Sequence, residues 1–128
     1  MRIQAYFDRI KQTVDQFSTM AMMLDSTIQF EDRPGDQGYL NGTIRFVDGS
    51  ALHFSEYIDA EETQYNKVTY RYHYQDANNE LIFRYDNAIH RPKLPYREHK
   101  HVSAQISQAD QPSLNDVLFE IFESNLWI

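Results

Sequence analysis

The sequence predicts an α+β fold, with an antiparallel sheet of about five meandering strands and a long N-terminal and a C-terminal helix packed on one face. Apolar residues recur at helical spacing near both ends of the chain, whereas apolar and polar residues alternate with period two between them. Short turns join the alternating runs, which favours antiparallel neighbours. Because the chain has 128 residues, we expect a single domain over residues 1–128.

The N-terminal helix is indicated by an apolar stripe whose residues step by three and four: Ile3, Phe7, Ile10, Val14, Phe17, Ala21 and Leu24. This spacing is typical of an amphipathic helix of about 20 residues, which we expect to end near Asp25. A methionine cluster at its C-terminal end (Met20, Met22 and Met23) is expected to fill gaps in the core.

Three strands are expected before the middle of the chain, over residues 26–32, 39–47 and 52–58. Asp48-Gly49 marks a hairpin between the second and the third. A three-residue loop, with Gly49 in the left-handed conformation, places Ile44 and Leu52 on the same face. A two-residue turn would instead put Leu52 opposite Arg45.

Glu56 falls on the apolar face of the third strand, between Phe54 and Ile58. Buried carboxylates are rare unless they are paired. Three interpretations stay open: the strand has reached the sheet edge and Glu56 meets solvent, Glu56 pairs with an arginine, or it is a functional acid.

The central hairpin is predicted over residues 68–86, with Asp76–Asn79 as its turn. Pairing Gln75 with Glu80 keeps both faces consistent, since a one-residue slip would put aromatic side chains opposite charges. On the aromatic face this register pairs Tyr74 with Leu81, Tyr72 with Phe83 and Tyr70 with Tyr85. On the polar face it pairs Arg71 with Arg84 and Thr69 with Asp86.

The pairing of Arg71 with Arg84 needs an explanation, because like charges directly opposite one another destabilise a sheet. Either nearby carboxylates such as Asp86, Glu80 or Glu56 neutralise the two arginines, or the arginines bind a phosphate.

A segment rich in proline and histidine follows the hairpin. Two prolines exclude a regular central strand over residues 87–95, so we expect an ordered loop or edge segment there. Residues 99–102 resume an extended run, with His99 and His101 on one side. Residues 66–101 hold seven of the twelve basic residues and four acidic ones, a local charge of about +3 on a chain of net charge −7.

The C-terminal helix is predicted to begin after Ser113, with Ser113 as N-cap and Asp116 completing a capping box. Its buried stripe is expected to be Leu114, Val117, Leu118, Ile121 and Phe122.

Composition excludes several classes of protein. The chain has no cysteine, which excludes disulfides, thiolate metal sites and a cysteine nucleophile. No signal peptide is recognisable, and no apolar run approaches the ~20 residues of a membrane span. We therefore expect a soluble, cytoplasmic protein without membrane contact. The acidic balance argues against binding nucleic acid over the whole surface, but it leaves room for one basic cleft.

The residues of the basic segment suit metal-free phosphoryl transfer on RNA. A histidine would transfer the proton and arginines would stabilise the charge that grows on phosphorus. The candidate catalytic residues are His99, His101, Arg71, Arg84, Asp86, His73 and His90, with His99 or His101 as the proton-transfer residue. The candidate substrate-binding residues are Tyr70, Tyr72, Lys93, Lys100 and Asn87, with the tyrosines stacking on unpaired bases.

Two alternatives stay open. His99 and His101, with His90 and Asp86, could ligate zinc in a metal-dependent hydrolase, although no zinc signature is present and we expect neither metal nor cofactor. The basic, aromatic surface could also hold an acidic partner protein without any catalysis.

Four strings resemble the TumE family, in the same order and spacing: Asp48-Gly49-Ser50, Tyr70–Gln75 (YRYHYQ), Phe83–Ala88 (FRYDNA) and His99–Val102 (HKHV). The resemblance covers about residues 38–102, with Ile89, Arg91 and Glu98 standing where the family tends to have more histidines. It implies a toxin component of a bacterial two-gene toxin–antitoxin system, neutralised by a small cognate antitoxin. Ribonuclease action is inferred from the site and not from the family, and a homodimer stays open.

Overall fold

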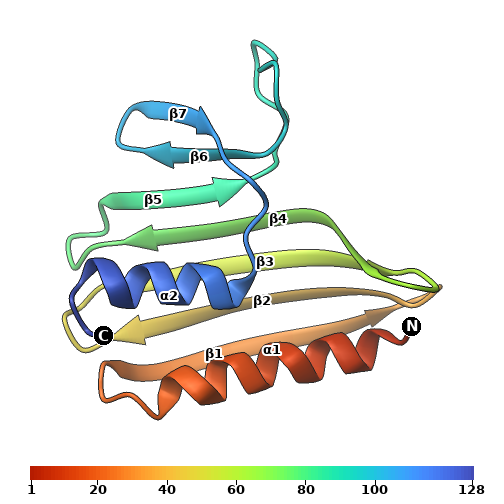
Figure 1. The fold of residues 1–128 in the computed structure, drawn as a ribbon, viewed down its shortest axis with the longest axis horizontal. Coiled ribbons are helices and arrows are strands. Elements are labelled where there is room, and N and C mark those ends of the chain that lie inside the picture. The colour runs from red at the N-terminus through yellow and green to blue at the C-terminus, as the bar shows by residue number, and fades with distance from the viewer.

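The computed structural model describes residues 1–128 as one antiparallel sheet covered by two helices (Figure 1). The seven strands follow one another in sequence order, β1-β2-β3-β4-β5-β6-β7. The elements are α1 (Ile3–Ser18), β1 (Met23–Arg33), β2 (Gln37–Phe46), β3 (Ala51–Ala60), β4 (Tyr65–Gln75), β5 (Leu81–Asp86), β6 (His99–Val102), β7 (Gln105–Gln108) and α2 (Leu114–Ser124). The α+β class and the antiparallel meander are confirmed. The estimate of about five strands is wrong, because β6 and β7 extend the sheet beyond the proline-rich loop.

Helix α1 has 16 residues and is shorter than predicted. Its first five stripe residues are buried, but Leu24 is exposed and already belongs to β1. The hydroxyls of Ser18 and Thr19 donate to the backbone oxygens of Asp15 and Gln16. Such local bonds compete with helical ones and favour the end of the helix there. The methionines therefore lie in the turn and at the start of β1, not at the end of a longer helix.

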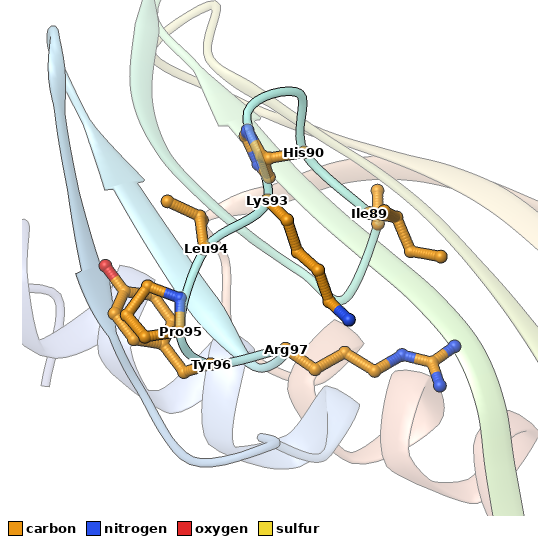
Figure 2. A pocket seen from close by; sticks show the side chains of 8 residues that line it. Ile89, His90, Lys93, Leu94, Pro95, Tyr96 and Arg97 are labelled. Carbon is orange, nitrogen blue, oxygen red and sulfur yellow. The ribbon is translucent and has the colours of Figure 1, made fainter.

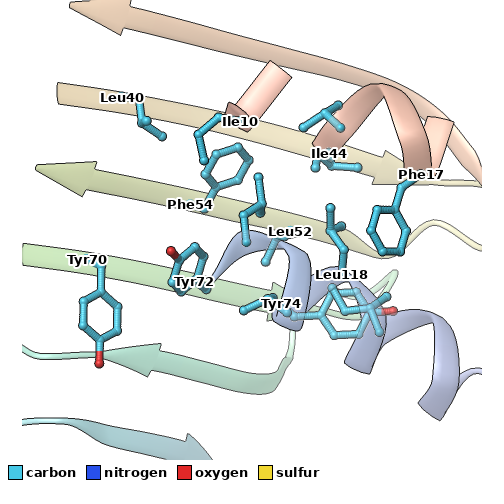
Figure 3. Close-up of a cluster of buried hydrophobic side chains, with 14 of the residues drawn as sticks. Ile10, Phe17, Leu40, Ile44, Leu52, Phe54, Tyr70, Tyr72, Tyr74 and Leu118 are labelled. Carbon is cyan, nitrogen blue, oxygen red and sulfur yellow. The ribbon is translucent and has the colours of Figure 1, made fainter. Parts of the chain in front are cut away.

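Both helices lie on the same face of the sheet and enclose its aromatic side (Figures 1 and 3). Phe17 of α1 packs on Phe122 of α2 with ring centroids 5.1 Å apart. Helix α2 has the predicted capping box between Ser113 and Asp116, and all five residues of its predicted stripe are buried. The opposite face of the sheet carries no helix.

The β2–β3 hairpin has the predicted geometry. Ile44 pairs with Leu52, and Gly49 adopts a φ of 89°. The backbone N–H of Phe46 donates to the Ser50 carbonyl at 3.0 Å, closing a three-residue loop.

The β4–β5 hairpin differs from the predicted register by two residues, because Glu80 belongs to the loop and Ile82 forms a bulge. Gln75 pairs with Leu81 and Tyr74 with Phe83, so Ile82 is the extra residue. The turn explains this difference, because the Asp76 carboxylate accepts the backbone N–H of both Asn78 and Glu80. Every predicted pair of this hairpin is therefore wrong: Gln75 with Glu80, Arg71 with Arg84 and Thr69 with Asp86, and on the aromatic face Tyr74 with Leu81, Tyr72 with Phe83 and Tyr70 with Tyr85.

In the observed register Arg71 faces Asp86 and His73 faces Arg84. No two residues of like charge stand opposite each other on this hairpin. The predicted division into an aromatic and a polar face nevertheless holds for Phe83 and Tyr85, because the longer loop and the bulge together shift the pairing by two residues. Leu81 is the exception, since it pairs with Gln75. Neither helix is long and apolar enough to cross a membrane.

Candidate functional site

Two rows of cross-strand neighbours occupy the helix-free face of the sheet. The first row runs from β3 to β6 through His53, His73, Arg84 and His101. The second row, beside it, runs through Ser55, Arg71, Asp86 and His99. Residues directly opposite one another share a face, so the sheet brings these side chains together from four strands.

Asp86 is the centre of a buried cluster at the β5–β6 end of these rows. Its Oδ1 lies 2.6 Å from Nε2 of His99 and accepts the Ala88 N–H at 3.0 Å. Its Oδ2 accepts the Nε–H of Arg84 at 3.0 Å and lies 3.6 Å from Nε2 of His101. The carboxylate therefore connects the sequence-predicted Arg84, His99 and His101.

His90 joins this cluster from the loop between β5 and β6. Its Nε2 lies 2.9 Å from Nε2 of His99, and its ring stacks on that of His101 with centroids 5.2 Å apart. The other ring nitrogen of His99, Nδ1, lies 2.7 Å from the Arg97 carbonyl oxygen and donates to it. Nε2 of His101 is buried and has no hydrogen-bond partner. Asp86, His90, His99 and His101 are the residues that could hold a metal ion.

His73 lies in the first row between His53 and Arg84 and is partly buried. Burial, followed by the charges of Arg71 and Arg84, lowers the pKa of His73 and favours its neutral ring at neutral pH. Burial and the charge of Arg84 also lower the pKa of His101. His53 stands opposite His73 with ring centroids 6.4 Å apart, and its Nδ1 lies 3.0 Å from the Thr43 hydroxyl.

A shallow groove of about 370 Å³ follows these histidines over the sheet. It is lined mainly by polar side chains, which include His53, His73 and Arg71. A smaller hollow of about 230 Å³ shares Ser55 and Arg71 with the groove and continues to Asp86, Asn87 and Ala88. Arg71 makes no side-chain hydrogen bond and lines both depressions.

The proline-rich loop forms a third depression of about 320 Å³, lined by Ala88, Ile89, His90, Lys93, Leu94, Pro95, Tyr96 and Arg97. Figure 2 shows the side chains of Lys93 and Arg97 extending to the same side of this loop. The loop depression shares Ala88 with the hollow beside Asp86, as that hollow shares Ser55 and Arg71 with the groove. We call this succession of three neighbouring depressions the path. Lys93 thus lies on this path as a free cation.

Four of the candidate substrate-binding residues make contacts within the protein. Tyr70 and Tyr72 are buried on the helix-covered face, so neither can stack on a base without leaving the core. Lys100 also faces α2, where its Nζ donates to Glu120 at 2.8 Å. The Asn87 side chain is buried and bridges the backbone groups of Val68 and Tyr70. These contacts support the fold, and of the four residues only Tyr70 and Asn87 also line the hollow beside Asp86.

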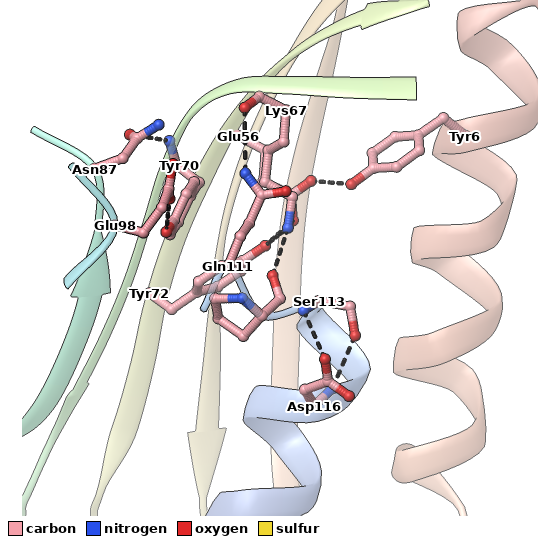
Figure 4. Close-up of polar contacts among 11 residues, drawn as sticks. Tyr6, Glu56, Lys67, Tyr70, Tyr72, Asn87, Glu98, Gln111, Ser113 and Asp116 are labelled. Carbon is pink, nitrogen blue, oxygen red and sulfur yellow. Dashed lines mark hydrogen bonds and ion pairs between the residues drawn. The ribbon is translucent and has the colours of Figure 1, made fainter. Parts of the chain in front are cut away.

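Glu56 is the centre of a second buried cluster, on the helix-covered face (Figure 4). It accepts hydrogen bonds from the hydroxyls of Tyr6 and Tyr72 and lies 3.9 Å from Nζ of Lys67. Its side chain is fully buried, so contact with solvent at a sheet edge is excluded, and its cationic partner is a lysine and not an arginine. Burial lowers the pKa of Lys67, whereas the nearby carboxylates raise it.

Sequence reasoning missed His53, Tyr6 and Lys67. His53 is signalled only by its parity, since it alternates with Leu52 and Phe54 and must share the polar face. The pairing with His73 could not be inferred before the β3–β4 register was known.

A family model described as "Toxin TumE" matches residues 10–125. Neither the curated proteins nor the solved structures contain a match.

Proposed function

The chain belongs to the TumE toxin family, and on this basis we propose that it is the toxin of a two-gene system. From the geometry of the site we further propose that it arrests growth by cleaving RNA in the groove of His53 and His73. A small antitoxin encoded beside it would neutralise it by covering this groove in the cytoplasm. The observation that carries the ribonuclease proposal is the open row in which one histidine stands opposite another and two arginines flank it.

The arginines supply the phosphate site. Arg71 is unpaired on the sheet surface, and Arg84 uses only its Nε–H on Asp86. The remaining guanidinium donors suit a phosphodiester, which accepts paired N–H groups from arginine. Charge that develops on the phosphate oxygens in the transition state would therefore meet two fixed cations.

The two histidines supply the proton transfers. His73, with its lowered pKa, takes the proton of the ribose 2′-hydroxyl as the 2′-oxygen attacks phosphorus. His53 in its protonated form gives a proton to the 5′-oxygen as the P–O5′ bond breaks. The products are a 2′,3′-cyclic phosphate and a 5′-hydroxyl. His99 and His101, the proton-transfer residues expected from the sequence, are buried, which favours this reassignment.

The path from the groove to Lys93 fits a single strand. An unpaired chain could lie along the three neighbouring depressions and place successive phosphates near Arg71 and Lys93. The net charge of −7 keeps nucleic acid away from the rest of the surface, so binding would be confined to this path.

The test combines growth and chemistry. Expression of the chain should arrest growth, and co-expression of the neighbouring gene should restore it. Purified protein should cleave RNA in the presence of a chelator and leave 2′,3′-cyclic phosphate ends. The His73→Ala and His53→Ala variants should each lose about 10²–10⁴ in rate, while Arg45→Ala, a surface variant of β2, should keep it. Growth arrest without RNA cleavage would refute the ribonuclease proposal and favour a toxin that acts by binding a protein.

A further inference from the structure

Three histidines and one aspartate direct their nitrogen and oxygen atoms at one point beneath the proline-rich loop. Asp86 comes from β5, His99 and His101 from β6, and His90 from the loop itself. One ligand atom from each residue lies within 4.8 Å of the other three. The three residues from the sheet are buried, and His90 closes the cluster from the loop side.

Protons alone do not satisfy these atoms. Because Nδ1 of His99 donates to the Arg97 carbonyl, a neutral ring carries its lone pair on Nε2. That lone pair would then lie 2.6 Å from the Asp86 carboxylate, even if His90 donated to it. A doubly protonated His99 would satisfy Asp86, yet Nε2 of His101 would still be buried without a partner. An unpaired buried acceptor is costly, and so are two acceptors in contact.

We propose that Asp86, His90, His99 and His101 bind one divalent transition-metal ion, for which zinc is the best match. Zinc accepts imidazole nitrogen and carboxylate oxygen, and its structural sites have four protein ligands in a tetrahedron. Ligand atoms in such a site lie about 3.3 Å apart, given metal–ligand distances of about 2.0–2.1 Å. Nε2 of His99 lies 2.6 Å from Oδ1 of Asp86 and 2.9 Å from Nε2 of His90, whereas Nε2 of His101 lies 3.6 Å from the other oxygen, Oδ2. With one ligand atom per residue, all separations stay within 4.8 Å. Small side-chain rotations suffice to admit the ion.

The surroundings of the ligands suit a metal site. Histidine ligands usually donate their second ring N–H to a backbone carbonyl or a carboxylate, and ligating carboxylates are themselves hydrogen-bonded. His99 donates to the Arg97 carbonyl, and Asp86 accepts from both Arg84 and the Ala88 N–H. These contacts fix the orientation of the ligands before any ion arrives.

The role assigned to the ion is structural. Four protein ligands leave no open position for substrate, in contrast to catalytic zinc sites. The ion would attach the loop of residues 87–98 to the sheet through His90, and so hold Lys93 along the path described above. The site itself does not depend on the proposed RNA cleavage, which proceeds in the neighbouring groove without metal.

The test uses full-length protein without a histidine tag, stripped with a chelator and dialysed against zinc or cobalt. Elemental analysis should find one ion per chain, the cobalt form should show the intense visible bands of tetrahedral coordination, and zinc should raise the thermal midpoint. His101→Gln and His99→Gln should lose stoichiometric binding. Arg84→Ala should keep the ligands but weaken zinc affinity by about 10–100-fold.

His53→Gln is the matched control for metal binding, since it removes a histidine from the same face but outside the cluster. It should retain one ion per chain. Failure of stripped wild-type protein to take up zinc would overturn the proposal, whatever the variants do. Equal loss of zinc in His53→Gln and His101→Gln would also overturn it. Cleavage of RNA in chelator by a protein that binds no zinc would refute the metal site alone, and zinc binding without cleavage would refute the ribonuclease alone.

Discussion

Arg84 donates its Nε–H to Oδ2 of Asp86 at 3.0 Å. The two residues are two positions apart on β5 and therefore lie on the same face of the sheet. Arg84 stands opposite His73 of the groove on one side and opposite His101 of the buried cluster on the other. Asp86 in turn stands opposite Arg71 and His99. This pair therefore connects the open row of the sheet with the cluster beneath the loop. The sequence predicted Asp86 as a candidate catalytic residue beside histidines and arginines, and in the structure its carboxylate contacts Arg84 and His99.

Replacing Arg84 by alanine should abolish growth arrest while leaving the fold intact. Its side chain is partly exposed and lies outside the apolar core. Loss of a donor that stabilises transition-state charge costs about 10²–10³ in rate. RNA cleavage and the far-UV spectrum of the variant, compared with those of Arg45→Ala, would check this expectation. Full toxicity of the Arg84→Ala variant would remove Arg84 from the phosphate site.

Lys93 and Lys100 should differ in their effect on RNA binding. Lys93 lines the loop depression, whereas Lys100 is paired with Glu120 on the helix-covered face. Alanine at Lys93 should weaken the binding of single-stranded RNA and lower the slope of log affinity against log salt by about 0.7, the value for one phosphate contact. Alanine at Lys100 should leave that slope unchanged. A salt titration of RNA binding by both variants would measure the two slopes. Equal slopes would place the RNA away from the loop.

Alternation of polar and apolar residues was enough to predict most of the fold. It assigned faces correctly along β2 to β5, and the three-residue loop at Gly49 followed from the need to keep Ile44 and Leu52 together. It could not reveal the bulge at Ile82, because a bulge changes partners without changing which face Phe83 occupies. Strand β7 was missed for a related reason. All four of its residues are exposed, so no burial pattern marks it.

The candidate site was predictable in its residue types and less so in its geometry. The basic, histidine-rich segment did supply Arg71, His73, Arg84 and Asp86 on one polar face. The position of His99 and His101 beside them depends on the β5–β6 pairing, which bridges a loop of irregular structure. Tyr70 and Tyr72 were expected to lie on the aromatic face and also to stack on bases of the substrate. Both side chains are buried, so burial supports only their place in the core.

Replacing Glu56 by alanine should destabilise the protein strongly. The change would leave Lys67 buried without its carboxylate and would remove the acceptor of two tyrosine hydroxyls. Removing one partner of a buried ion pair typically costs about 3–5 kcal/mol. Urea denaturation would measure this loss as a lower midpoint.

Arg45→Ala is the matched control, because Arg45 pairs with Asp25 in an exposed salt bridge. Such surface pairs contribute little to stability, because solvent and salt screen the two charges. If Glu56→Ala proved as stable as Arg45→Ala, the buried cluster would not be a stabilising element.

Alkaline pH should unfold the protein through its buried tyrosines. Burial is the largest cause that raises the pKa of five of them above the ordinary 10.0: Tyr6, Tyr70, Tyr72, Tyr74 and Tyr85. Above about pH 10 the unfolded chain loses these protons while the folded chain keeps them, so the folded state binds more protons and stability falls as pH rises. Lys67 has the opposite effect, because its pKa is lowered in the folded state, but it is one group against five.

The replacement of Tyr72 by phenylalanine tests this mechanism directly. Tyr72 is fully buried, and the charge of Glu56 adds to burial in raising its pKa. The variant should lose some stability at neutral pH, since Glu56 loses a donor. Its stability should then fall less steeply above about pH 10, by up to 1.4 kcal/mol per pH unit for one proton. Urea midpoints measured between about pH 8 and pH 11 give both slopes. Identical slopes would mean that Tyr72 ionises equally in the folded and unfolded states, and this result would contradict the proposed mechanism.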